Sequence, residues 1–162
     1  WGPNNYGQCG QDSSKYNAII QPTLINQLDA NIYIQSISCS DYHTILLSAN
    51  GDLYSFGRTA YGRLGIGETT SIDSVEIPRQ IKGDFGKIMS VSCGDAHSIC
   101  VDHLGHLYTW GNGDLLQLGN GQLGDIYTPQ RVTSKQLNEV YPFVLQASGG
   151  AQHTLLLAEA QK

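Results

Sequence analysis

The stretch WGPNNYGQCG at residues 1–10 returns as FGRTAYGRLG at 56–65 and again as WGNGDLLQLG at 110–119. The first residues of these stretches are separated by 55 and 54 positions. A second phrase recurs at nearly the same interval, as ISCSDYHTILL (37–47), VSCGDAHSICV (91–101) and SGGAQHTLLLA (148–158). A third, GDLYSFG at 51–57, reappears as GHLYTWG at 105–111. Phrases that recur in a constant order predict a structural repeat, with units at about 1–55, 56–109 and 110–162.

Each unit carries the signals of short antiparallel strands. In the first unit, residues 32–38, 43–48 and 53–57 are β-prone and are separated by turn residues. Asn50-Gly51 predicts a tight hairpin with positive φ at both residues, and Pro78 and Pro129 are expected to open outer, edge-type strands. Four short strands in about 54 residues are typical of a propeller blade. The sequence therefore predicts an all-β propeller with three four-stranded blades and no helix longer than 134–139.

Composition and charge limit the classes of partner. The net charge is −5, so this segment alone is expected to bind little nucleic acid directly, and a basic protein partner fits better. The four cysteines, Cys9, Cys39, Cys93 and Cys100, form no C-x-x-C pair, and no histidine lies at zinc-finger spacing from them. No signal peptide or membrane-spanning apolar run is present, which favours a nuclear or alternatively a cytoplasmic setting, with no membrane partner.

The repeated aromatic and histidine residues have a structural interpretation. Trp1, Phe56 and Trp110 are expected to pack between blades. His43, His97 and His153 could be metal ligands, but they occupy equivalent positions at the start of successive apolar strands. We therefore expect them to satisfy buried polar groups near the central shaft. The sequence contains no clustered carboxylates, metal-ligand set or nucleophile with a partner base, so we expect no cofactor, no metal and no covalent catalysis.

Together the phrases resemble a known repeat. The pattern W-G-x-x-x-x-G-Q/R-L-G, then S-C/G-G-x-x-H-T, then G-x-L/V-Y-x-W-G is similar to the regulator of chromosome condensation repeat, and the similarity covers the whole chain. Residues 61–68 and 135–157 also resemble the C-terminal blades of the Ran exchange factor that founded this family. The resemblance implies seven blades, of which three are present here. The other blades are then expected from elsewhere in the same gene product or from a second copy of the chain. Leu116 replaces the glycine found at Gly7 and Gly62, so that turn is expected to differ.

The resemblance also implies a function. It points to part of a guanine-nucleotide exchange factor that acts on a Ran-like small GTPase through one propeller face, in the nucleus. Histones or chromatin would be contacted through parts outside this chain. The alternative is a non-catalytic interaction propeller within a larger protein, such as a ubiquitin ligase, a kinase or a ciliary scaffold, since one fold serves many functions.

The candidate contact residues lie in the turns that precede the repeated histidines. In the exchange factors, acidic and histidine residues of these turns face the GTPase, which implicates Asp41, Tyr42 and Asp95 here, with His43 as a further candidate. The alternative is that Asp41 and Asp95 cap their own turns through Asx-type hydrogen bonds. The sequence leaves these two roles open.

Overall fold

The computed structural model describes residues 1–68 and 71–160, and this part of the chain is all-β apart from two short helical turns, Ala60–Gly62 and Gln136–Val140. Its strands form four antiparallel sheets, two with four strands and two with two strands. In chain order the strands are β1 (Gly2–Pro3), β2 (Ala18–Ile19), β3 (Ile34–Cys39), β4 (His43–Ser48), β5 (Leu53–Arg58), β6 (Ser74–Ile81), β7 (Ile88–Cys93), β8 (His97–Asp102), β9 (Leu107–Gly111), β10 (Ile126–Arg131), β11 (Phe143–Gly149) and β12 (Thr154–Glu159).

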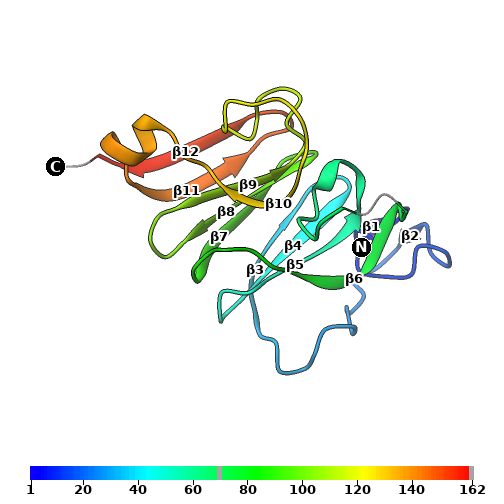
Figure 1. The fold of residues 1–162 in the computed structure, drawn as a ribbon. Helices are drawn as coiled ribbons and strands as arrows, with labels where there is room; N and C mark the ends of the chain where they lie inside the picture. Colours follow the sequence, from blue (N-terminus) through cyan, green and yellow to red (C-terminus); the bar gives the residue numbers. More distant parts are fainter. Residues whose placement is uncertain (69–70, 161–162) are drawn as a thin grey trace.

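The sheets follow one another like blades. Figure 1 shows them in chain order, from the β1–β2 pair at the right, through the β3–β6 and β7–β10 sheets, to the β11–β12 pair at the upper left. The two pairs together contain one blade's worth of strands, so the chain carries the strands of three four-stranded units. The predicted all-β class is therefore confirmed. Each complete sheet, however, takes its strands from two sequence units, because the fourth strand lies beyond the next W/F-G phrase.

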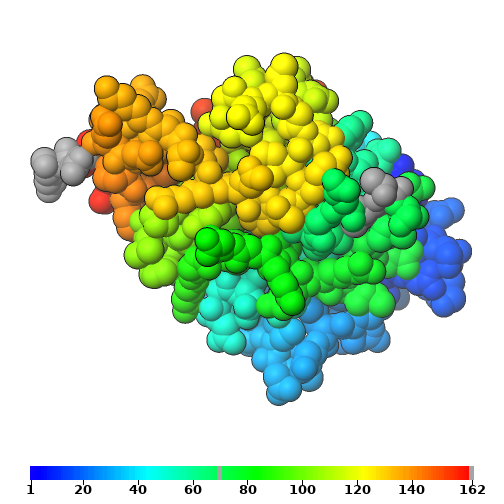
Figure 2. All heavy atoms as spheres, viewed as in Figure 1, coloured from blue at the N-terminus to red at the C-terminus, as the bar shows by residue number. Residues whose placement is uncertain are grey.

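Alternating connections place the loops at two opposite ends of the sheets. Each complete sheet is an antiparallel meander in chain order. The turns between β3 and β4, β7 and β8, and β11 and β12 therefore lie at one end, which we call the turn face. The loops after β1, β5 and β9 lie at this end too. The β4–β5 and β8–β9 hairpins lie at the other end, the hairpin face. Figure 2 shows the outer strands β6 (green) and β10 (yellow to orange) on the side turned to the reader.

The main core lies between the two complete sheets. Ile45, Leu47 and Leu53 of the first sheet pack with Ile88 and Trp110 of the second, and all are almost fully buried. A second cluster joins β8 and β9 to the β11–β12 pair. The apolar residues on the facing sides of neighbouring sheets therefore stabilise the stack mainly through contacts between blades.

Three local predictions differ from the structure. At the β4–β5 hairpin only Gly51 has positive φ, at 91°, because Ser48 O accepts from Gly51 N and sets a turn that leaves Asn50 in an ordinary conformation. Pro78 and Pro129 lie inside β6 and β10, within register irregularities where no ladder donor is required. Leu116 keeps the left-handed backbone of its glycine counterparts, with φ 63°, so the turn does not change.

Candidate functional site

The turns that precede the repeated histidines converge on the turn face. They are Ser40–Tyr42, Gly94–Ala96 and Gly150–Gln152, and residues from all three line an open cavity of about 410 Å³. The second and third turns are linked directly, because Asp95 N donates to Ala151 O over 3.2 Å. The rigid strands behind each turn therefore hold three loops from successive repeats around one shared hollow.

The carboxylates of Asp41 and Asp95 border this cavity. Asp41 is exposed and Asp95 is half-buried. Within the described residues, neither carboxylate accepts a hydrogen bond, although the backbone oxygens of both residues do. In the first turn the capping role belongs to Ser40, whose Oγ accepts from Tyr42 N and His43 N at 3.3 and 3.2 Å. In the described part of the chain, no hydrogen bond thus supports Asx-type capping by Asp41 or Asp95, and both carboxylates are available to a partner.

Two of the repeated histidines form hydrogen bonds between neighbouring blades. His43 is fully buried, with Nδ1 2.7 Å from Ser40 Oγ and Nε2 2.8 Å from Ser98 Oγ of the next sheet. His97 Nε2 lies 3.0 Å from Thr154 Oγ1 of the following sheet in the same way. Burial, with a smaller effect from Arg63, lowers the pKa of His43 to about 3. Burial, followed by the effect of the neighbouring histidine of the next repeat, lowers the pKa of His97 to about 4. Both rings are therefore neutral at physiological pH and suited to accept or donate within the stack.

The burial of the repeated aromatic residues depends on whether a neighbouring sheet covers them. Phe56 and Trp110 are buried between sheets, and Trp110 Nε1 donates to Arg63 O over 3.0 Å. Trp1, by contrast, is 77% exposed, and His153 is exposed as well. The packing between blades expected for Trp1 and the burial expected for His153 are therefore wrong. Both residues adjoin the two-stranded sheets β1–β2 and β11–β12, beside which the described residues supply no further blade.

A group of residues missed by the sequence reasoning lies beside Tyr42. Five side chains alternate along the turn face in the order Tyr6, Arg58, Tyr42, Arg63 and Tyr61, and we call them the Tyr–Arg array. The Arg58 guanidinium lies 4.8 Å from the Tyr6 ring centre and 5.5 Å from that of Tyr42. The Arg63 guanidinium lies 5.6 Å from the Tyr42 ring centre and 5.4 Å from that of Tyr61. These are cation–π distances.

A sequence signal for this array lies in the difference between the units. The positions of Arg58 and Arg63 are occupied by Pro3 and Gln8 in the first unit and by Asn112 and Gln117 in the third. Only the middle unit carries two cations there. An alignment of the units shows mainly what they share, so a feature confined to one unit does not stand out as part of the repeat.

The described residues give no sign of a metal centre or a membrane span. In residues 1–68 and 71–160, no three histidine, cysteine or acidic side chains come together in a way that could hold a metal ion. In the same part of the chain, no helix has the length and apolar character needed to cross a bilayer. Cys93 is buried, and burial raises the pKa of its thiol to about 12, which makes it a packing residue and not a nucleophile.

Comparison with known proteins places this geometry among characterised folds. The family model described as "Regulator of chromosome condensation (RCC1) repeat" matches residues 1–47, 50–101 and 105–157. The Regulator of chromosome condensation of Xenopus laevis is 35% identical over 157 residues, which cover 97% of this chain and 36% of that protein. The human E3 ubiquitin-protein ligase HERC2 is 32% identical over 156 residues, which cover 96% of this chain and 3% of the ligase.

A solved structure agrees with the sequence comparisons. Prp20p from Saccharomyces cerevisiae, whose binding properties to Gsp1p and histones are described, superposes with a TM-score of 0.88 at 26% identity. The alignment covers 100% of this chain and 39% of Prp20p. The chain thus spans little more than a third of the length of the Xenopus protein and of Prp20p.

Proposed function

Because the chain belongs to the regulator of chromosome condensation (RCC1) repeat family, we propose that it forms part of a propeller that promotes guanine-nucleotide exchange on a small GTPase of the Ran type. The turn face makes the contact. The observation that carries the proposal is the pair of carboxylates, Asp41 and Asp95, which border one cavity and accept no hydrogen bond within the described chain. Tyr42 lines the same cavity, and His43 contributes by holding the Ser40 turn in place.

Exchange of this kind requires binding and no covalent step. A GTPase holds its nucleotide through a phosphate-binding loop, a lysine and Mg²⁺. A partner that binds the empty GTPase more tightly than the loaded one must weaken nucleotide binding by the same factor. Asp41 and Asp95 are suited to pair with the positive groups that the departing phosphates leave behind, and the rigid blades keep them in position.

The relatives support wider partners for the complete protein. Prp20p has described binding properties to Gsp1p and to histones. We propose a nuclear location and contact with histones or chromatin through segments outside these 162 residues. In this proposal, further blades of the same protein, or a second copy of the chain, complete the two-stranded sheets β1–β2 and β11–β12. Direct binding of nucleic acid by this acidic segment is weak in this proposal.

Release of labelled GDP from a Ran-type GTPase tests the exchange function. The full-length protein should accelerate release, and Asp95→Ala should reduce the acceleration at least about tenfold while the melting temperature changes little. Asp84→Ala is the control, because it removes the same carboxylate charge from an exposed residue of the β6–β7 loop, at the hairpin face. Failure of the wild-type protein to accelerate release overturns the proposal. An equal effect of the two substitutions on GDP release would show that Asp95 has no specific role in exchange.

A scaffold function is the second candidate, and the similarity to HERC2 favours it specifically. That ligase contains a stretch 32% identical to nearly the whole of this chain. A propeller of the scaffold kind binds a protein partner through the same turn face without affecting nucleotide release. Partner capture by a full-length protein that leaves GDP release unchanged would select this function.

A further inference from the structure

The Tyr–Arg array contains two guanidinium groups without a carboxylate partner. Arg63 is only 2% exposed, yet its Nε and Nη1 donate to the backbone oxygens of Ala60 and Asp95, at 2.9 and 3.2 Å. Neither Arg58 nor Arg63 forms an ion pair with any acidic side chain of the described chain. Buried charges are ordinarily paired, because an unpaired charge is costly to desolvate. Burial and the neighbouring Arg58 lower the pKa of Arg63, and the charge of Asp95, which forms no ion pair with it, offsets this effect only in part.

Tyr61 adds a second, independent peculiarity. Its backbone is left-handed, with φ 65°, and the residue is 46% exposed, with its ring centre 5.4 Å from the Arg63 guanidinium. A left-handed conformation costs a tyrosine about 1–2 kcal/mol, and strain of this kind is concentrated at binding sites. If the array only held the blades together, there would be no reason to strain an exposed aromatic residue in this way.

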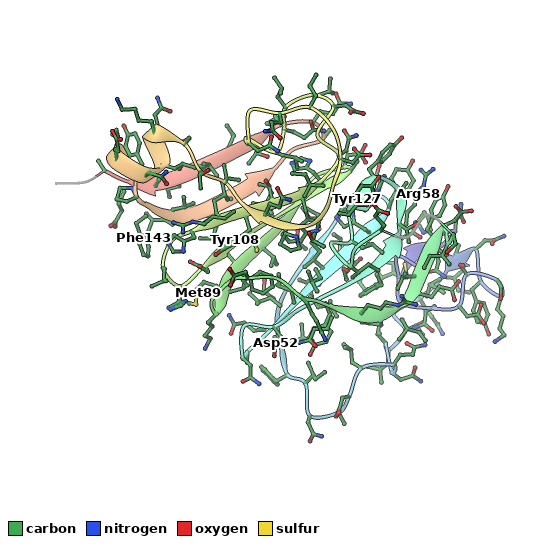
Figure 3. All side chains as sticks on the ribbon, viewed as in Figure 1. Asp52, Arg58, Met89, Tyr108, Tyr127 and Phe143 are labelled. Carbon is green, nitrogen blue, oxygen red and sulfur yellow. The ribbon has the colours of Figure 1, made fainter. Side chains whose placement is uncertain are left out.

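A cavity opens beside the array on the same face. It has a volume of about 340 Å³ and is lined by Tyr6, Tyr61 and Tyr127, with Arg58 in its wall and the exposed Asp73 as its one acidic residue. Figure 3 shows Arg58 and Tyr127 next to each other on that part of the molecule. Half-buried Arg58 is thus a cation within reach of solvent, in a cleft that three tyrosines help to line.

We propose that this cleft and the Tyr–Arg array bind a short acidic segment of a partner protein, with one carboxylate against Arg58 and its apolar stem between the tyrosine rings. A carboxylate supplies the counter-ion that Arg58 lacks, and the planar Arg58 fork can receive it bidentately. The inference is independent of nucleotide exchange, since any protein with such a segment would satisfy it.

Nucleic acid fits the same surface poorly. Asp73 lines the cleft, Asp41 and Asp95 lie on the same face, and the whole chain has a net charge of −5. A phosphodiester chain would bring a charge at every nucleotide past these carboxylates, whereas a short acidic segment brings fewer charges and places one carboxylate against Arg58. The favoured occupant is therefore a peptide side chain.

Fluorescence anisotropy of the full-length protein with a labelled tetraglutamate peptide tests the proposal. The peptide should bind, with affinity that falls with rising salt, and a tetraglutamine peptide should not. Arg58→Gln should weaken binding at least about tenfold. Arg79→Gln, at an exposed position of β6, makes the same charge change and should leave binding within about twofold of wild type. Equal effects of the two substitutions, or no binding of tetraglutamate, overturn the inference.

Two further measurements test the tyrosine rings and the chemistry of the ligand. Tyr61→Gly relieves the left-handed strain and removes the ring, so it should raise the melting temperature and yet weaken peptide binding several-fold. A stable Tyr61→Gly protein with undiminished binding would contradict the role of the array. A labelled decathymidine that binds more tightly than tetraglutamate, and loses this binding in Arg58→Gln, would overturn the assignment to a protein segment. Failure of GDP-release experiments would leave all these outcomes unaffected.

Discussion

A single leucine at the turn after β9 is the clearest local departure from the repeat. Leu116 holds φ 63° where Gly7 and Gly62 hold 72° and 75°, and its side chain is 54% exposed. Replacing it with glycine removes a conformational cost of about 1–2 kcal/mol and adds a smaller entropy cost in the unfolded chain. Leu116→Gly should therefore stabilise the protein by about 0.5–1 kcal/mol, measured by chemical denaturation.

The neighbouring residue provides the control for this prediction. Leu115 is 57% exposed and has an ordinary negative φ. Leu115→Gly should thus destabilise the protein by about 0.5–1 kcal/mol, since it gains only the entropy cost of glycine. If both substitutions changed the unfolding free energy in the same direction, exposure and not backbone conformation would control the stability of this turn.

Residue roles were predictable where the repeat fixes them, and were not where one unit departs from the others. The inward position of His43 and His97 follows from their place at the start of apolar strands, and the structure shows both buried. The orientation of the Asp41 and Asp95 carboxylates does not follow from the sequence, because Asx capping and a free side chain suit the same turn. The Tyr–Arg array was not predictable because the sequence does not show that Tyr6 and Tyr42 contact the segment at the end of β5 that carries the two arginines.

At the scale of elements, the loop after β5 packs onto the next sheet through a glycine. Gly65 has φ 69°, and a Cβ there would lie 2.6 Å from Trp110 Nε1. Gly67 has φ 91° with open space around it. Gly65→Ala should therefore cost about 2–4 kcal/mol of unfolding free energy, from backbone strain plus overpacking. Gly67→Ala should cost about 1–2 kcal/mol, from strain alone.

Thermal or urea unfolding of both variants measures the difference between their losses of unfolding free energy. This difference arises from the contact between the β5 loop and Trp110. Equal losses for Gly65→Ala and Gly67→Ala would mean that the indole moves aside and that this inter-blade contact is soft. Loss of the hydrogen bond from Trp110 Nε1 to Arg63 O would accompany a larger loss at Gly65.

The elements themselves were largely readable from the sequence, but their grouping into sheets was not. Strands β3, β4 and β5 fall largely on the β-prone stretches 32–38, 43–48 and 53–57, which are bounded by turn residues. The fourth strand of each sheet, β6 or β10, follows a loop after the next W/F-G phrase, and the long connection hides which sheet it joins. The repeat period constrains the number of strands and does not specify where one blade ends, because any starting point gives the same period.

On the scale of the whole molecule, the blades are joined by a row of neutral histidines. His43 bridges to Ser98 and His97 bridges to Thr154, so each ring connects one sheet to the next. Their pKa values, about 3 and about 4, lie below the ordinary value of 6.5, chiefly because of burial. Below pH 6.5 the unfolded chain therefore binds protons that the folded chain does not bind. The stability contribution of these rings is fully present above this pH and is lost as the pH falls toward the two folded-state values.

Each histidine should lower the unfolding free energy by about 2 kcal/mol between about pH 7 and about pH 5, because one pH unit in this window is worth about 1.4 kcal/mol per proton. Urea unfolding of the full-length protein across this range measures the slope. His43→Gln should reduce the loss of unfolding free energy between about pH 7 and about pH 5 by about 2 kcal/mol, even if stability at neutral pH also falls. The same change at the exposed His103 serves as the control and should preserve the slope. An unchanged slope in His43→Gln would mean that the stack opens to protonate its histidines without unfolding. The row would then be a set of local hinges, and the blades would not act as one cooperative body.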